Sequence, residues 1–214
     1  MGLSSALDDA ATTLVADAST IINLIATGSA PAILRALPHR MVVVDVVPTE
    51  LETGRTRGRT TVDGFKELVA IGMLDVVELP EEGAAYFEGL VVGSAAETLD
   101  DGEAATIAYA LTRPAVALID ERKATRICGQ RFPHLALAST VDVFCHPEVQ
   151  RQLGTDAVGM AIYGALREAR MSVLPHQVDW IVGVIGIERA AMCDSLPRRA
   201  RSVSADTGDG QALR

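Results

Sequence analysis

The chain has 214 residues, of which 49% are hydrophobic, 22% charged and 4% aromatic. This composition excludes a chain that is disordered throughout and suffices for one domain with a sizeable core plus an extension. The formal net charge of −9 argues against a broad basic surface for duplex nucleic acid, although a site that collects carboxylates for metal ions is acidic by design.

Targeting signals and redox motifs are not evident in the sequence. The opening residues place no basic segment before their apolar run, and no apolar stretch approaches the roughly 18 residues of a membrane span. The cysteines Cys128, Cys145 and Cys193 are odd in number and far apart, which is typical of reduced thiols. We therefore expect a cytoplasmic protein without a membrane segment.

The first half of the chain alternates between strand and helix patterns. Residues 13–17 form a short apolar run that ends in an acid, and residues 19–28 show helical spacing that Gly28 stops. A second helix over 31–37 precedes the β-branched run 41–47, which is typical of a strand buried on both faces of a parallel sheet. The next elements expected are a helix over 48–52, a flexible basic loop over 54–61, a helix over 62–72, a strand over 73–79 and one or two helices within 81–99.

The second half continues this alternation and then becomes helical. The expected elements are a helix over 99–113, a strand over 114–120, a helix over 121–130, a short strand over 135–139, and two helices at about 155–170 and 175–193. Alternating strands and helices predict an α/β fold with a central parallel sheet. We expect an α/β domain over 12–146, a helical extension over 147–196 and a disordered tail over 197–214.

Acidic residues stand where the expected strands end or where helices begin beside them. Six meet this condition: Asp17, Glu50, Asp101, Glu103, Asp120 and Glu121. In a parallel α/β sheet, ligands bind outside the carboxyl ends of the strands, so these acids should converge although they are distant in sequence. Carboxylates gathered in one cleft repel one another unless a cation is bound, and all-oxygen ligation favours Mg²⁺ or Mn²⁺. The pattern predicts metal-assisted phosphodiester hydrolysis.

Each of these acids also has a purely structural explanation. Asp17 would cap the following helix, and Glu50 would be a solvated helix acid. Asp101 and Glu103, together with Asp100, would be first-turn acids that complement a helix dipole. Asp120 and Glu121 would form surface ion pairs with the basic residues that follow them. The combination of four acidic segments is more specific than any single segment.

Two further groups of polar residues are candidates for supporting roles. Arg55, Arg57 and Arg59 lie in the expected basic loop and would either contact the phosphates of a phosphodiester substrate or simply be solvated. Ser19 and Thr20 would donate hydrogen bonds that orient Asp17, although helix capping would place them identically. The four histidines show neither metal-ligand spacing nor a neighbouring nucleophile.

Over roughly Thr13 to Cys145 the chain resembles the PIN-domain family, in the prokaryotic branch that includes ribonuclease toxins of toxin–antitoxin pairs and uncharacterised relatives. The opening LVADASTIINLIATG is similar to the family's first strand and acid, with Asp17, Ser19 or Thr20, and Asn23 in the motif positions. The stretch PTELETG is similar to the second acidic segment and assigns its role to Glu50.

The third and fourth acidic segments complete this resemblance. LDDGEAATIAYAL resembles the Asp-x-Gly-Glu form of the third, which makes Glu103 the ligand and Asp101 its neighbour. ALIDERKATRIC is similar to the fourth, where the alignment can shift by one residue between Asp120 and Glu121.

The resemblance implies a three-layer α/β/α fold and an Mg²⁺- or Mn²⁺-dependent endoribonuclease that hydrolyses phosphodiester bonds of single-stranded RNA. It assigns catalysis to Asp17, Glu50, Glu103 and Asp120, and metal binding to these four with Asp101 and Glu121. It also implies a toxin role, with an antitoxin or a second copy of the chain as protein partner. The alternative is a PIN-like module without efficient catalysis that acts through its helical extension as a binding or regulatory partner. A dehalogenase-like phosphatase would need a second acid where Ser19 stands.

Overall fold

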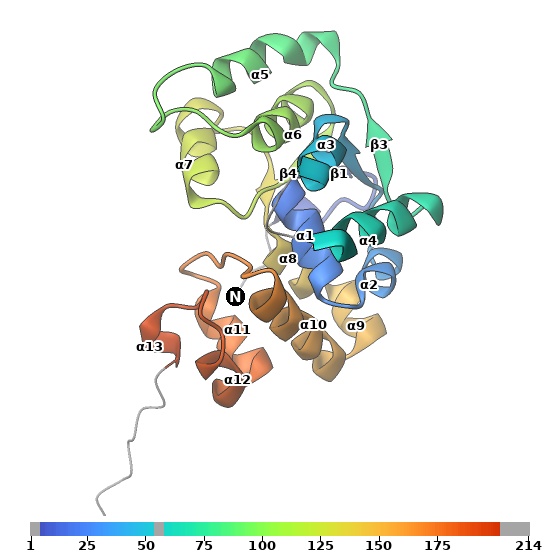
Figure 1. The fold of residues 1–214 in the computed structure, drawn as a ribbon, viewed down its shortest axis with the longest axis vertical. Helices are drawn as coiled ribbons and strands as arrows, with labels where there is room; N and C mark the ends of the chain where they lie inside the picture. Colours follow the sequence, from blue (N-terminus) through green and yellow to red (C-terminus); the bar gives the residue numbers. More distant parts are fainter. Residues whose placement is uncertain (1–4, 54–57, 202–214) are drawn as a thin grey trace, which may run out of the picture.

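The computed structural model describes residues 5–53 and 58–201, which form a parallel five-stranded sheet with helices on both faces (Figure 1). The strand order is β3-β2-β1-β4-β5. The strands are β1 (Thr13–Ala16), β2 (Met41–Val44), β3 (Asp75–Val77), β4 (Ala115–Leu118) and β5 (Leu137–Ala138). The expected three-layer α/β/α architecture is confirmed.

The central strand β1 fixes which residues emerge together at the carboxyl edge of the sheet. Leu14 pairs with Met41 of β2 and with Val116 of β4, and Ala16 pairs with Leu118. Because parallel neighbours run in the same direction, the segments after β1 and β4 leave the sheet side by side.

The sheet separates two apolar cores, since consecutive side chains of a strand point to opposite faces. Leu14 and Ala16 belong to one core and Val15 to the other. The first core packs against α1 (Ala18–Ala26), α2 (Ala30–Ala36) and α8 (Thr140–Cys145). The second packs against α5 (Ala84–Val91), α6 (Asp101–Thr112) and α7 (Arg122–Arg131). Helices on both faces explain why the apolar runs of β2 and β4 are buried throughout.

Two expected elements differ from the structure in this part of the chain, and further helices appear that were not expected. The run 41–47 leaves the sheet after Val44, because Val46–Thr53 form helix α3. The expected basic loop is shorter, since α4 (Gly58–Ala70) begins at Gly58. Helix α8 was not expected, although a capping box of Ser139 and Asp142 opens it. Short 3₁₀ helices η1 (Ser5–Leu7) and η2 (Glu81–Gly83) complete this part of the chain.

The C-terminal part of the described chain consists of α9 (Pro147–Leu153), α10 (Thr155–Glu168), α11 (Val178–Ile185), α12 (Ile187–Ala191) and α13 (Arg198–Arg201). The single helix expected over 175–193 is two helices, because Gly186 adopts φ +81° between them. Helix α13 lies within the segment expected to be disordered, whose remainder, 202–214, is outside the described residues. No helix in the described ranges is long and apolar enough to span a membrane.

Helices α9 to α12 add side chains to the core that already contains Leu14. Helix α10 lies against α1, where a Cβ on Gly164 would stand 2.8 Å from the carbonyl oxygen of Ala26. Glycine at this position allows the two backbones to approach closely. The C-terminal helices are therefore packed on the layer that begins directly after the first acid, Asp17.

Candidate active site

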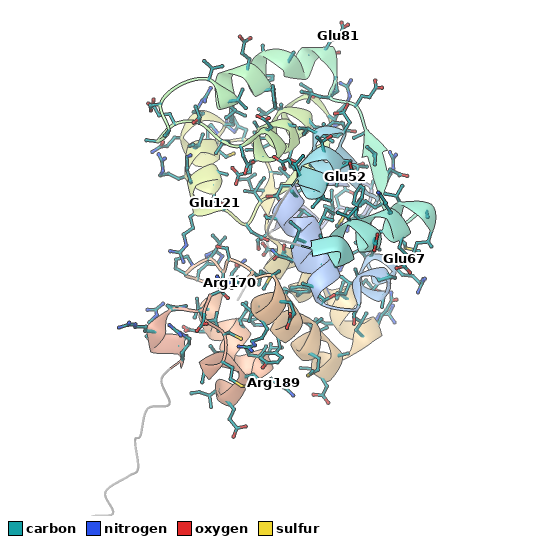
Figure 2. All side chains as sticks on the ribbon, in the orientation of Figure 1. Glu52, Glu67, Glu81, Glu121, Arg170 and Arg189 are labelled. Atoms are coloured by element: carbon teal, nitrogen blue, oxygen red, sulfur yellow. The ribbon has the colours of Figure 1, made fainter. Side chains whose placement is uncertain are left out.

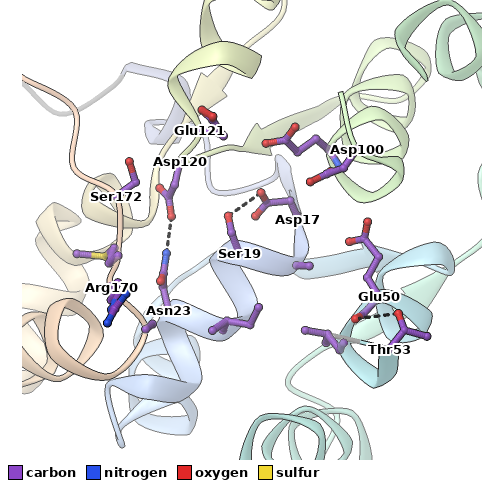
Figure 3. Close-up of a pocket in the computed structure, with 16 residues that line it drawn as sticks. Asp17, Ser19, Asn23, Glu50, Thr53, Asp100, Asp120, Glu121, Arg170 and Ser172 are labelled. Carbon is purple, nitrogen blue, oxygen red and sulfur yellow. Dashed lines mark hydrogen bonds between the residues drawn. The ribbon is translucent and has the colours of Figure 1, made fainter. Parts of the chain in front are cut away.

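A cavity of about 520 Å³ opens at the carboxyl edge of the sheet (Figure 3). It is lined by six acids: Asp17, Glu50, Asp100, Glu103, Asp120 and Glu121. The remaining lining residues are Ala18, Ser19, Ile22, Asn23, Leu51, Thr53, Ala169, Arg170, Met171 and Ser172. The four acidic segments of the sequence therefore contribute to a single cavity.

Asp17 joins β1 to α1 and is the N-cap of that helix. Its carboxylate accepts hydrogen bonds from the Thr20 backbone N–H at 2.7 Å and from the Ser19 hydroxyl at 2.7 Å. The side chain is buried, and this burial raises the pKa of Asp17 despite the two donors. Thr20 also donates its hydroxyl to the carbonyl oxygen of Leu118 at 3.3 Å, which ties α1 to the end of β4.

Asp120 follows β4 and is held by donors from two other elements. Its carboxylate accepts hydrogen bonds from Asn23 Nδ2 at 2.7 Å, from the Thr140 backbone N–H at 2.8 Å and from the Thr140 hydroxyl. Burial, followed by the charge of Asp17, raises the pKa of Asp120 to about 6. Thr140 was not anticipated from the sequence, because its position depends on how the chain turns from β5 into α8.

Glu50 reaches the cavity from α3 and binds the start of α6. Its Oε1 accepts a hydrogen bond from the Gly102 backbone N–H at 2.9 Å. A Cβ on Gly102 would collide with the Glu50 carboxylate, so glycine is required for this approach. Burial, with the neighbouring charge of Asp100, raises the pKa of Glu50.

Helix α6 supplies two acids to the cavity, and its N-cap is one of them. Asp100 accepts a hydrogen bond from the Glu103 backbone N–H at 2.9 Å. The Glu103 side chain is buried, and its pKa rises to about 8 through burial and the charges of Asp100 and Asp17. Asp101, an expected ligand, is exposed and does not line the cavity. Asp100, and not the expected Asp101, therefore lines the cavity.

Asp120 and Glu121 both line the cavity but have different surroundings (Figure 3). Asp120 is 3% exposed, whereas Glu121 is exposed and caps α7 by accepting a hydrogen bond from the Lys123 backbone N–H at 2.8 Å. Burial and three donors fix the Asp120 carboxylate.

Basic residues near the cavity differ from those expected. Arg55 and Arg57 lie outside the described residues, and the side chain of Arg59 is not described either. Arg170, from the segment after α10, lines the cavity instead. Sequence reasoning missed it because it is far from the acidic motifs and belongs to no recognisable pattern.

A family model described as a PIN domain matches residues 13–133, more than half of the chain. The chain belongs to the PIN-domain family. No curated protein and no solved structure matches the chain significantly. PIN domains are generally metal-dependent nucleases, so membership indicates nuclease chemistry at the cavity where the acids converge.

The donor chemistry of this PIN cavity fits a hard divalent cation. The described lining includes neither histidine nor cysteine, and its carboxylate oxygens are the ligands preferred by Mg²⁺ and Mn²⁺ over Zn²⁺. Within the described residues, no three such side chains are already close enough together to hold an ion. The burial and repulsion that raise the carboxylate pKa values are the conditions that a bound cation relieves.

Glu103 should make the stability of the metal-free PIN domain depend on pH. Unfolded, this carboxyl releases its proton near its ordinary pKa of 4.5, whereas in the folded chain its pKa is about 8. Between these values the folded state binds more protons, so the free energy of unfolding falls as pH rises. We expect this loss between about pH 4.5 and about pH 8 in denaturant titrations with EDTA, and a flatter profile for Glu103→Gln.

The matched control is Glu67→Gln, which changes an exposed glutamate of α4 in the same way. Burial lowers the pKa values of His39 and His146, so their contribution to the pH dependence has the opposite sign and is the same in the wild type and in Glu103→Gln. Equal slopes for the wild type and Glu103→Gln would contradict the assignment of the raised pKa to Glu103.

Proposed function

We propose that the protein is an Mg²⁺- or Mn²⁺-dependent endoribonuclease that hydrolyses phosphodiester bonds of single-stranded RNA. The observation that supports this most strongly is the convergence of carboxylates from four separate segments in one cavity at the carboxyl edge of a PIN-domain sheet. Such a site suits phosphodiester chemistry because divalent ions activate a water and stabilise the leaving oxygen.

Within this proposal, Asp17, Glu50, Glu103 and Asp120 would hold the metal. Asp17 and Asp120 are held in place by Ser19, Thr20, Asn23 and Thr140. Because these two carboxylates are already held in position, little reorganisation is needed when charge develops in the transition state. Glu50 and Glu103 have longer side chains that can adjust to the ion. Asp100 and Glu121 also line the cavity.

The decisive experiment uses end-blocked, single-stranded RNA of mixed sequence. We expect internal cleavage with Mg²⁺ or Mn²⁺ and none with EDTA, because the carboxylates cannot perform this chemistry without the ion. A circular RNA of the same sequence should be opened, which distinguishes an endonuclease from an exonuclease. Binding of both metal and RNA without cleavage would contradict the enzyme and favour the binding module that acts through its helical extension.

The biological setting that we propose is a cytoplasmic toxin with a cognate antitoxin. Support comes from the resemblance of the acidic motifs, and expression of the wild type should arrest growth whereas Asp17→Asn should not. Unimpaired growth with abundant active nuclease would exclude this role.

We also propose that the protein forms a homodimer. Three exposed apolar side chains of the extension, Met160, Ile187 and Met192, offer contact area for it, and sedimentation measures the association state.

A further inference from the structure

The wall of the cavity includes residues from outside the matched PIN segment. Residues 13–133 supply all six acids, whereas Ala169, Arg170, Met171 and Ser172 come from the segment that follows α10. Figure 3 shows Arg170 and Ser172 on the same side of the cavity as Asn23 and Asp120. The C-terminal extension therefore contributes directly to the site.

Arg170 has an unusual backbone conformation. Among the described residues it is the non-glycine residue with positive φ, at 54°. It follows Ala169, the C-cap of α10, and the Met171 N–H donates to the Ala165 carbonyl oxygen at 3.1 Å to close the helix end. Glycine is the usual residue at such a left-handed position, because a side chain is strained there. Strained backbone of this kind is concentrated at functional sites.

The segment around Arg170 is fixed by its neighbours. Met171 and Val173 are buried, and Arg122 Nη2 donates to the Val173 carbonyl oxygen at 3.2 Å. Gln177 is also buried; it accepts a hydrogen bond from the Leu174 N–H at 3.2 Å and donates to the Ser139 hydroxyl at 2.7 Å. These contacts attach the segment to the start of α7 and to the residue before Thr140. They hold Arg170 at the edge of the cavity.

The guanidinium of Arg170 is exposed and available. Within the described part of the chain, the guanidinium forms no hydrogen bond and no ion pair with a carboxylate. It is also the one cationic side chain among the described lining residues. Figure 2 places Arg170 on the loop between α10 and α11, on the side facing Glu121. If Arg170 served only to neutralise the acids of the cavity, its guanidinium would form an ion pair with one of them.

We propose that Arg170 binds a backbone phosphate of the RNA next to the bond that is cleaved. This inference rests on the proposed function, because it assigns the substrate contact of the same cavity. A phosphodiester strand entering a cavity of six acids is repelled unless cations offset the charge, and the planar guanidinium matches two phosphate oxygens. Glycine would fit the left-handed backbone at position 170 better than arginine does. A phosphate contact gives the arginine side chain a function that glycine could not perform.

The test replaces Arg170 by the residue that suits its backbone. Arg170→Gly removes the side chain without imposing a new strain on the left-handed backbone, so we expect the variant to fold. We expect the Kd for a labelled single-stranded RNA, measured by fluorescence anisotropy in an Asp17→Asn background, to rise about 10-fold. The slope of log Kd against log salt concentration should decrease by about 0.7, the value for one phosphate contact on a single strand.

Two controls separate charge from position. Arg170→Lys should retain the salt slope, and Arg35→Ala, an exposed arginine of α2, should change neither quantity. Unchanged Kd and slope in Arg170→Gly would overturn the inference while leaving the nuclease intact. RNA binding that depends on Arg170 without cleavage by the wild type would retain the inference and reject the proposed function. Absence of both binding and cleavage would reject both.

Discussion

Replacing Asp17 by asparagine is expected to reduce metal-dependent RNA cleavage about 1000-fold while leaving the free energy of unfolding within about 0.5 kcal/mol of the wild-type value. Asparagine is as good an N-cap as aspartate, so its side-chain oxygen can still accept the hydrogen bond from Thr20. The change removes the negative charge from a buried position where burial already raises the pKa of the carboxyl. The folded state loses a repulsive charge but also the carboxylate oxygen that accepts from the Ser19 hydroxyl, and these two changes offset each other. The metal loses a ligand.

Cleavage rates at saturating Mg²⁺ and urea denaturation of the same samples check both parts of this expectation. The matched control is Asp156→Asn, which neutralises an exposed acid in the first turn of α10. That variant should cleave RNA at the wild-type rate. Full activity in Asp17→Asn would remove Asp17 from the active site and with it the proposed metal site.

Gly102→Ala should lower cleavage about 100-fold although it adds only one methyl group. The new Cβ would collide with the Glu50 carboxylate, which must then leave its hydrogen bond with the Gly102 N–H. In a helix, alanine is more favourable than glycine by up to about 1 kcal/mol, so unfolding should not become easier once Glu50 has moved. The loss would therefore appear in activity and in metal affinity.

Metal affinity by isothermal titration and cleavage by a gel assay test this displacement of Glu50. Gly129→Ala is the control, because it is also a helical glycine and a Cβ there meets nothing within 4 Å. Wild-type metal affinity in Gly102→Ala would show that the position of Glu50 is not needed.

The parallel sheet could be predicted because buried strands have a distinctive local composition. The run MVVV at 41–44 is apolar on both faces and lies between two helical layers. Local composition misled at Val46 and Val47, whose β-branched side chains favour strands but which begin α3. Helix α8 has a similar strand-like sequence, yet the Ser139 and Asp142 capping box was a usable signal for its start.

The site could be predicted where it depends on strand ends and not where it depends on packing. Asp17 directly follows β1 and Asp120 lies two residues after the end of the paired strand β4, so topology alone brings them together. The choice between Asp100 and Asp101 depends on the residue at which α6 begins, which a run of acids leaves ambiguous. Arg170 and Thr140 reach the cavity only because of how α10 and α8 are positioned in the folded chain.

Most acids of the cavity also bind the first amides of a helix. Each accepts a hydrogen bond from a backbone N–H in the first turn. Asp17 binds α1 in this way, Asp120 binds α8 and Glu121 binds α7. Asp100 and Glu50 both bind α6. Glu103 is different: in the described structure no hydrogen bond to its carboxylate is found. Helix capping contributes about 1 kcal/mol for each residue, so five of the acids support the fold whether or not RNA is cleaved.

A relative that had abandoned catalysis would therefore still be under selection to keep those five carboxylates, and their presence is weak evidence that such a relative is an enzyme. The position of Glu103 is more informative. A buried acid with a pKa of about 8 destabilises the folded state of a protein that binds no cation there. Loss of the acid at this one position would distinguish a degenerate PIN domain from a working one.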